Sequence, residues 1–164
     1  MEFKLKSISP EGIEAALSKA ELYRFLNEPE EAESICEDVL AVQPGHQLAL
    51  RTLGLALTDQ FSGAATDRYS DAENALQQLC DAYERLYYTG LLHERRAKAQ
   101  LRAGRPPHTL TVLLEEAMRS YEEAERIRPV GNDDAILRWN RCARLLHSRV
   151  ESEWHREVEI EMGE

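Results

Sequence analysis

Apolar residues recur at intervals of three and four along most of the chain, and this spacing predicts amphipathic helices. The first helix is expected to begin at Ser9-Pro10-Glu11, where a capping residue precedes a proline at the first helical position. Sustained apolar–polar alternation and Asn-Gly hairpin signals are absent, so no strands are expected. The pattern predicts an all-α protein whose later helices cover about 30–42, 46–58, 69–87, 91–103, 109–127 and 135–149, with a short turn at 27–29 before the first of these.

Two connectors separate groups of these helices: residues 59–68 (DQFSGAATDR) and residues 104–107 (GRPP). Neither is long or biased enough in composition to be a linker between domains. A single helical domain over residues 1–164 is therefore expected, closed by an acidic C-terminal tail.

Two distant segments share one pattern of residue types. EEAESICEDVLAVQP covers residues 30–44, and EEAMRSYEEAERIRP covers residues 115–129. Both begin with Glu-Glu-Ala, continue with packing residues four and seven positions after the alanine, and end at a proline. This repetition indicates that one helical unit occurs more than once in the chain.

The pattern resembles the tetratricopeptide repeat (TPR) family, whose 34-residue unit is a helix-turn-helix with small residues at the helix crossing. Extra residues at the two connectors bring the later units into register, and Trp139-Asn140-Arg141-Cys142-Ala143 matches the opening of a last unit. The positions that match the family's packing and terminal-proline places are Ala20, Tyr23, Ala32, Cys36, Val39, Pro44, Leu50, Leu53, Gly54, Ala75, Leu79, Ala82, Leu92, Ala97, Ala117, Tyr121, Ala124 and Pro129.

The resemblance covers about residues 13–149, or about three and a half repeats. It implies a right-handed α-solenoid of antiparallel helix pairs, in which neighbouring units stack to form a continuous core. Solenoid ends need a covered apolar side, so residues 150–162 are expected to form a C-terminal capping helix.

Composition narrows the class of partner. The net charge of −10 argues against binding to nucleic acid or to an anionic membrane. No apolar run approaches the roughly 18 to 20 residues that span a bilayer, and the N-terminal MEFKLKSISPEG lacks a signal-peptide core. The odd number of cysteines without CxxC spacing favours a reduced, cytoplasmic protein in which Cys36, Cys80 and Cys142 are small buried residues.

Catalytic and metal-binding motifs are absent from the sequence. No P-loop, GxGxxG, HExxH or GxSxG occurs, and the five histidines are not spaced as zinc ligands. The paired carboxylates Glu30-Glu31 and Glu115-Glu116 are interpreted as helix-start residues that the helix dipole stabilises. No enzyme activity, cofactor or metal is expected.

Charge is segregated between the two helices of each expected unit. The acidic residues gather on second helices and are Glu28, Glu30, Glu31, Glu33, Glu37, Asp38, Glu115, Glu116, Glu122, Glu123 and Glu125. The basic residues gather on first helices and are Arg95, Arg96, Lys98, Arg102, Arg105, Arg138, Arg141, Arg144 and Arg149. In TPR proteins first helices line the concave groove, so the resemblance implies a basic groove and an acidic outer face.

Arg95 and Lys98 take the same repeat positions as Arg141 and Arg144, so these four cations are expected side by side. The residues expected to bind a partner in the groove are Arg24, Arg51, Arg95, Lys98, Arg102, Asn140, Arg141 and Arg144. They would pair with the carboxylates of an extended or helical segment of another protein. The alternative is that the arginines pair with glutamates of neighbouring helices. The family's carboxylate clamp is not expected, because Leu17 and Glu21 stand at two of its positions.

The C-terminal stretch carries Val150, Trp154, Val158 and Met162 at i, i+4 spacing between glutamates. A cap over the last unit is the favoured interpretation, and a dimer or partner contact through Val150, Trp154 and Val158 is the alternative. The sequence therefore predicts a protein-protein interaction module, or else a homo-oligomerising helical module that assembles through its tail.

Overall fold

The computed structural model describes residues 2–163, apart from the side chains of residues 150, 154 and 157. Within this range all regular secondary structure is helical, which confirms the all-α prediction. The elements are η1 (Pro10–Gly12), α1 (Ile13–Phe25), α2 (Pro29–Val42), α3 (Gln47–Asp59), α4 (Tyr69–Gln77), α5 (Ala82–Arg102), α6 (Pro107–Arg126) and α7 (Asp134–Met162).

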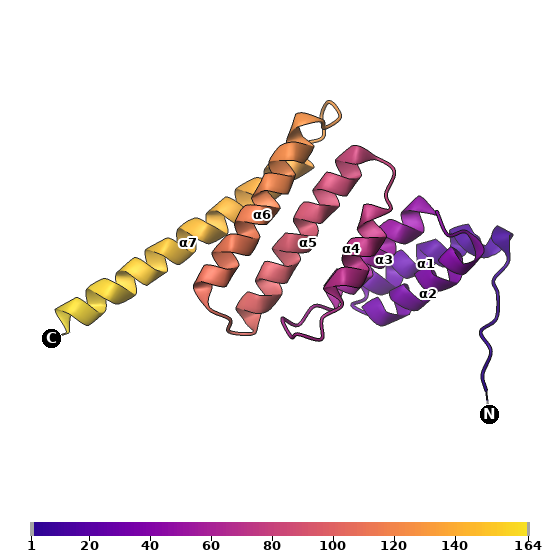
Figure 1. The fold of residues 1–164 in the computed structure, drawn as a ribbon, viewed down its shortest axis with the longest axis horizontal. Helices are drawn as coiled ribbons and strands as arrows, with labels where there is room; N and C mark the ends of the chain where they lie inside the picture. The colour runs from indigo at the N-terminus through magenta and orange to yellow at the C-terminus, as the bar shows by residue number, and fades with distance from the viewer. Residues whose placement is uncertain (1, 164) are drawn as a thin grey trace.

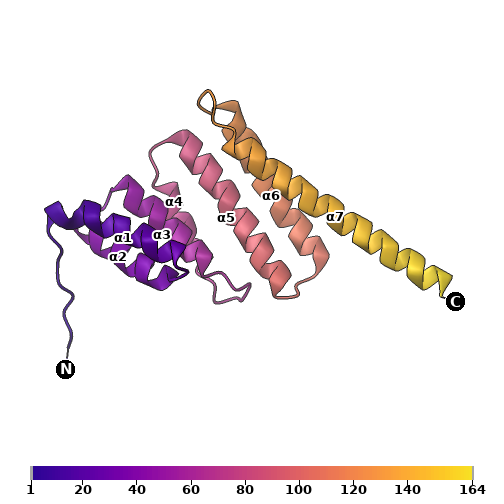
Figure 2. The same cartoon turned by 180° about the vertical axis from the view of Figure 1, so that it is seen from behind.

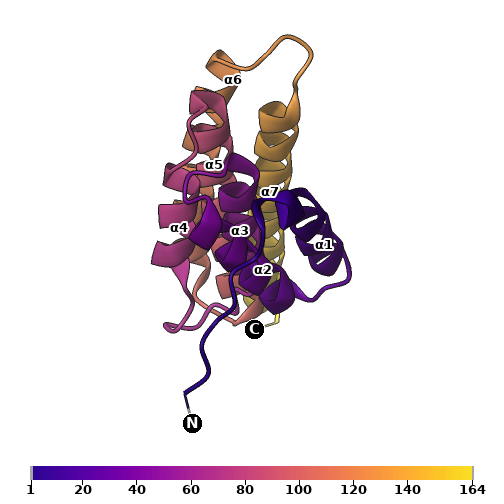
Figure 3. The ribbon, with the colours of Figure 1, turned by 90° about the vertical axis from the view of Figure 1, so that its right-hand side faces the viewer.

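Each α-helix packs against the next one along the chain (Figure 1). In addition, α1 contacts α3, and α3 contacts α5. The view turned by 90° shows α4 and α6 on the opposite side of the molecule from α1 and α7 (Figure 3). Three buried clusters succeed one another from α1 to α7, so the core extends along the molecule and is not gathered at one centre.

Most of the positions matched to the repeat pattern are packing positions. Those that are buried are Ala20, Ala32, Cys36, Val39, Leu50, Gly54, Ala75, Leu79, Leu92, Ala97, Ala117, Tyr121 and Ala124. Tyr23 and Leu53 are partly buried against the same clusters. Ala82 is exposed at the start of α5, so its assignment as a packing residue is wrong.

Two helical glycines let neighbouring helices approach closely. A Cβ on Gly54 would lie 2.5 Å from Cδ2 of Leu76, and a Cβ on Gly90 would lie 2.6 Å from Cε1 of Tyr121. Both distances are far inside van der Waals contact, so the backbones of α3 and α5 lie directly against these buried side chains. Gly54 matches a small-residue position of the repeat pattern, and Gly90 serves the same purpose in α5.

The predicted boundary between the helices at 69–87 and 91–103 is wrong. α4 ends at Gln77, and α5 runs without a break from Ala82 to Arg102. Asp81 sets this start, because its side chain accepts a hydrogen bond from the Glu84 N–H at 2.9 Å, as an N-cap does. Gly90 falls in the expected break between the two helices, yet it lies inside α5, where the Tyr121 ring requires it.

Residues 150–162 do not form a separate capping helix. α7 runs continuously from Asp134 to Met162 and extends beyond the end of α6 (Figures 1 and 2). The stretch contains neither proline nor glycine, so nothing in its sequence ends the helix. The side chains of Val150 and Trp154 lie outside the described residues, and Val158 is partly exposed, so their role in a cap or dimer stays a prediction. No helix in residues 2–163 has the length and apolar character to cross a membrane.

Candidate functional site

A charged hollow of about 320 Å³ lies between α3, α5 and α7. We call it the charged hollow, and its lining residues are Thr58, Asp59, Glu94, Arg95, Lys98, Arg102 and Arg138. These residues come from the end of α3, the second half of α5 and the first turns of α7. Three helices that are not consecutive in sequence therefore supply one site, and all three contain expected first helices of repeat units.

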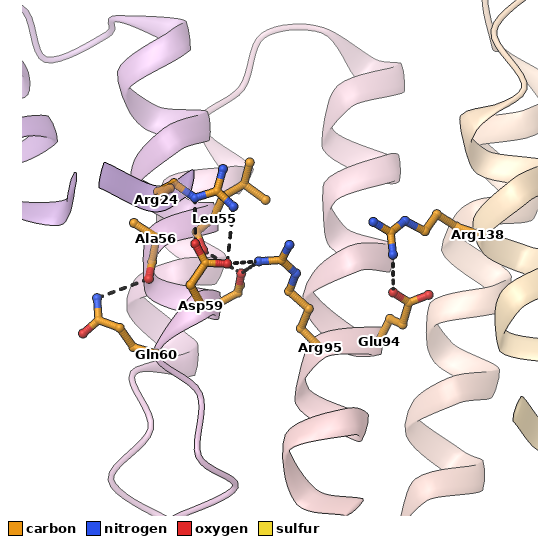
Figure 4. Close-up of polar contacts among 9 residues, drawn as sticks. Arg24, Leu55, Ala56, Asp59, Gln60, Glu94, Arg95 and Arg138 are labelled. Atoms are coloured by element: carbon orange, nitrogen blue, oxygen red, sulfur yellow. Dashed lines mark hydrogen bonds and ion pairs between the residues drawn. The ribbon is translucent and has the colours of Figure 1, made fainter. Parts of the chain in front are cut away.

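Asp59 connects the side chains at the α1 side of the charged hollow. Its carboxylate accepts hydrogen bonds from Arg24 Nε at 2.7 Å and Arg24 Nη2 at 3.3 Å, and it also pairs with Arg95 (Figure 4). Arg95 Nη1 donates a further hydrogen bond to Thr58 Oγ1 at 2.8 Å. One carboxylate thus lies between two guanidinium groups, joining α1, α3 and α5.

Glu94 lies at the α7 side of the hollow, connects the side chains there, and is completely buried. Its Oε2 accepts a hydrogen bond from Arg138 Nη1 at 3.1 Å (Figure 4) and lies 3.3 Å from Lys98 Nζ. Its Oε1 accepts a hydrogen bond from the Cys142 thiol, with Sγ and Oε1 3.2 Å apart. Burial is the largest influence on the pKa of Arg138 and lowers it, but the Glu94 carboxylate together with Tyr87 and Tyr121 outweighs burial, and the net shift is upward. Arg138 therefore remains charged within the protein.

The charged hollow has more positive than negative charge. Four cationic side chains and two carboxylates line it, and Arg24 adds a further cation at its Asp59 edge. Within the described residues Arg102 forms no ion pair, and it is exposed on the hollow's wall. A local excess of positive charge on a protein whose net charge is −10 can attract an anionic group.

The structure shows that most of the predicted groove cations are already paired. Arg24 and Arg95 share Asp59, Lys98 pairs with Glu94, and Arg51 Nη1 lies 2.9 Å from Glu84 Oε1. The alternative interpretation, pairing with glutamates of neighbouring helices, is confirmed for Arg51, whereas Arg24 and Arg95 pair with an aspartate, Asp59. Lys98 pairs within its own helix.

The predicted side-by-side arrangement of Arg95 and Lys98 with Arg141 and Arg144 stays a prediction, because only Arg95 and Lys98 of these four line the charged hollow. Arg141 and Arg144 are exposed on α7 and do not line the hollow, and partly buried Asn140 does not line it either. The α7 cation that shares the hollow with Arg95 and Lys98 is Arg138, which donates a hydrogen bond to Glu94.

The two carboxylates that organise the site are missing from the residues expected to bind a partner. Asp59 falls in the expected connector, and Glu94 is a lone acid among cations in the sequence. The i, i+4 spacing of Glu94 and Lys98 is the available signal for a pair. The contact between Glu94 and Arg138 depends on how α7 packs, which no local pattern contains.

Three acidic residues expected on the outer face or at a helix start lie elsewhere. Glu33 is buried, accepts a hydrogen bond from Gln60 Nε2 at 2.7 Å and pairs with Arg68, so it ties α2 to both ends of the 59–68 connector. Glu115 and Glu116 lie inside α6 and do not begin it, since Pro107 begins that helix. Glu30 and Glu31 do lie in the first turn of α2.

Two of the three cysteines are buried as expected. Burial, aided by Glu94 for Cys142, raises the pKa of Cys36 and of Cys142 to about 12. Cys80 is exposed, so its predicted burial is wrong, because it lies in the turn between α4 and α5. In residues 2–163 no group of three or more His, Cys, Asp and Glu side chains is placed to hold a metal ion.

Comparison of the chain with protein-family models, with curated proteins and with solved structures finds no match.

Proposed function

We propose that this protein is a TPR-like interaction module that receives a carboxylate-bearing segment of another protein in the charged hollow. The excess of positive charge in that hollow carries the proposal. Cations that repel one another are stabilised when an anion meets them, and Arg binds carboxylates through two parallel hydrogen bonds. The incoming segment is an extended strand or a helix that lies across α3, α5 and α7.

The paired residues refine the recognition chemistry. Arg24, Arg95 and Arg138 are held in place by Asp59 and Glu94, so they form a pre-organised positive wall. A pre-organised wall binds with a smaller loss of side-chain entropy than free side chains would. Arg102 has no such partner within the described residues and is the primary contact for a ligand carboxylate.

A selection from a display library of random 12-residue peptides tests the proposal, with the full chain immobilised at low salt. Peptides rich in Asp and Glu are expected from the unmodified protein, and Arg102→Glu should remove this enrichment. Arg119→Glu is the matched control, because Arg119 is exposed on α6 and the substitution changes the net charge equally. Recovery of neutral or basic peptides by the unmodified protein would contradict the proposal.

A second candidate function is homo-oligomerisation through the end of α7. The observation that favours it is the extension of α7 beyond α6, where Ile160 is 71 % and Met162 81 % exposed (Figure 2). Exposed apolar side chains on an unpacked helix are stabilised by burial against another surface. Light scattering measures the mass of the full chain and of a chain ending at Arg149. Oligomerisation through α7 predicts that the full chain has a mass above that of the monomer and that the truncated chain has the mass of the monomer.

The cytoplasmic location stays a prediction. The cysteines Cys36, Cys80 and Cys142 are free, which is the state expected of thiols in a reducing compartment.

A further inference from the structure

A second hollow, of about 480 Å³, lies where the N-terminal ends of α3, α5 and α7 come together. We call it the tyrosine pocket, and its lining residues are Gln47, Cys80, Asp81, Tyr83, Glu84, Tyr87, Tyr88, Pro129, Asn132 and Asp134. It shares α3, α5 and α7 with the charged hollow, which lies nearer the C-terminal ends of α3 and α5.

Aromatic rings form part of this pocket. The rings of Tyr87 and Tyr88 are 5.0 Å apart between centroids and meet at 82°, so they present two surfaces at nearly a right angle. The ring of Tyr83 stacks on Tyr87 at 5.9 Å. The face of an aromatic ring carries negative electrostatic potential, which favours a cation placed over the face.

Carboxylates that line the tyrosine pocket also favour a cation there. Glu84 already pairs with Arg51, whereas Asp81 and Asp134 form no ion pair with any described cation. Burial and the neighbouring Asp134 carboxylate raise the pKa of Tyr83. The Tyr83 hydroxyl is itself buried and lies beside the Asn132 side chain, which also lines the pocket. The pocket thus combines aromatic ring faces with two carboxylates, Asp81 and Asp134, that form no ion pair within the described residues.

We infer that the tyrosine pocket binds a cationic side chain, a lysine ammonium or an arginine guanidinium, of the same partner segment. This inference rests on the proposed function for the identity of the partner, but not for the chemistry of the pocket. Tyr87 and Arg102 lie on one helix about 22 Å apart at 1.5 Å per residue. An extended segment covers that distance with about seven residues. The partner segment therefore carries a basic residue about seven positions from its acidic residues.

Cys80 allows the pocket to be tested without the partner, because it is exposed, lines the pocket, and is the one such thiol among Cys36, Cys80 and Cys142. The full chain is equilibrated with cystamine and with bis(2-hydroxyethyl) disulfide at the same thiol–disulfide ratio. Mass spectrometry then measures how much more of Cys80 carries the aminoethyl group than the hydroxyethyl group. The inference predicts at least a fivefold preference for the cationic group.

General attraction of cations to an acidic protein is controlled by moving the thiol. In a Cys80→Ser background, Ser34→Cys places an exposed thiol on α2 among glutamates but away from the tyrosines. This site should show less than half of the preference at Cys80. An equal preference at the two sites would overturn the inference.

Variants of the pocket assign the preference to particular groups. Asp134→Asn, at an exposed position, should reduce it at least twofold, and Tyr88→Leu should reduce it to the value at the Ser34→Cys site. Tyr88→Phe retains the ring and should retain the preference, which separates loss of the ring from loss of the fold. A preference that survives both Asp134→Asn and Tyr88→Leu would refute the inference. A positive tethering result together with a failed peptide selection would refute only the proposed function.

Discussion

Oε2 of Glu94 lies 3.1 Å from Nη1 of Arg138, and this ion pair joins α5 to α7 at a carboxylate that is completely buried. The side chain of Arg138 is about one-third exposed, whereas that of Glu94 is 1 % exposed. Removal of Glu94 and removal of Arg138 therefore have different consequences for stability. A guanidinium left alone can hydrate, but a buried carboxylate left alone cannot.

Arg138→Ala should lower the free energy of unfolding by about 3 kcal/mol, because it leaves the buried Glu94 charge with Lys98 as its remaining cation. Lys98→Ala should cost less, since Arg138 still donates to Glu94. Urea denaturation monitored by circular dichroism measures both. Arg144→Ala is the control on the exposed side of α7 and should change stability by less than about 0.5 kcal/mol. Equal losses for all three variants would contradict the assigned role of the pair.

Gly90→Ala should destabilise the protein by about 1–3 kcal/mol, because the added Cβ would lie 2.6 Å from the buried Tyr121 ring. Gly54→Ala should also destabilise it, through a contact of 2.5 Å with Leu76. Gly45→Ala is the matched control, since a Cβ there meets no atom within 4 Å. Gly45→Ala should leave stability unchanged or raise it slightly. The midpoint of thermal unfolding measures the stability of all three variants.

Asp67→Ala should speed amide hydrogen exchange at Ser62 and Gly63, whose N–H groups donate to the Asp67 carboxylate at 3.0 and 2.7 Å. Burial raises the pKa of Asp67, but these hydrogen bonds outweigh it and hold the pKa below its ordinary value. A lowered folded-state pKa stabilises the connector above the unfolded-state pKa. This contribution is lost as pH falls through the folded-state pKa. Protection factors that do not change with acid or with the substitution would contradict the assignment.

One thiol should react rapidly with an aromatic disulfide reagent in the folded protein, and all three should react in urea. Cys80 is exposed, whereas burial raises the pKa of Cys36 and Cys142 to about 12 and excludes the reagent. Cys80→Ser should remove the rapid phase. A rapid phase that remains in Cys80→Ser would show that a second thiol is accessible.

Asp59→Asn should strengthen the binding of an acidic peptide severalfold at low salt, because it removes a carboxylate that neutralises Arg24 and Arg95. The same variant should lose some stability, since Asp59 joins α1, α3 and α5. Salt should reduce the gain in affinity as it screens the added charge. Weaker binding by a folded Asp59→Asn variant would contradict the proposed electrostatics.

Periodicity and small-residue spacing are enough to predict an all-α chain and most of its core, because helix packing repeats locally at positions such as Ala32, Cys36, Ala117 and Tyr121. The boundary at Asp81 is not predicted because one capping hydrogen bond decides it. The continuous α7 is not predicted because the repeat pattern implies a separate cap, although no helix breaker occurs in this stretch.

The candidate site is less predictable than the fold. Basic residues are recognised on the correct helices, but the paired state of Arg95 depends on Asp59, which is 36 positions away. Glu94 and Arg138 are 44 positions apart. Such contacts form only when separate helices pack, so a single sequence contains no local signal for them.

The central claim is that a partner's carboxylates bind in the charged hollow beside Arg102. The most direct measurement is a fluorescence anisotropy titration of one acidic peptide recovered from the display selection against the unmodified protein, Arg102→Glu and Arg119→Glu. Both variants make the same change in net charge, on α5 and on α6 respectively. The account predicts that Arg102→Glu raises the Kd at least tenfold while Arg119→Glu changes it less than twofold. Equal effects of the two substitutions, or no effect of Arg102→Glu, would contradict it.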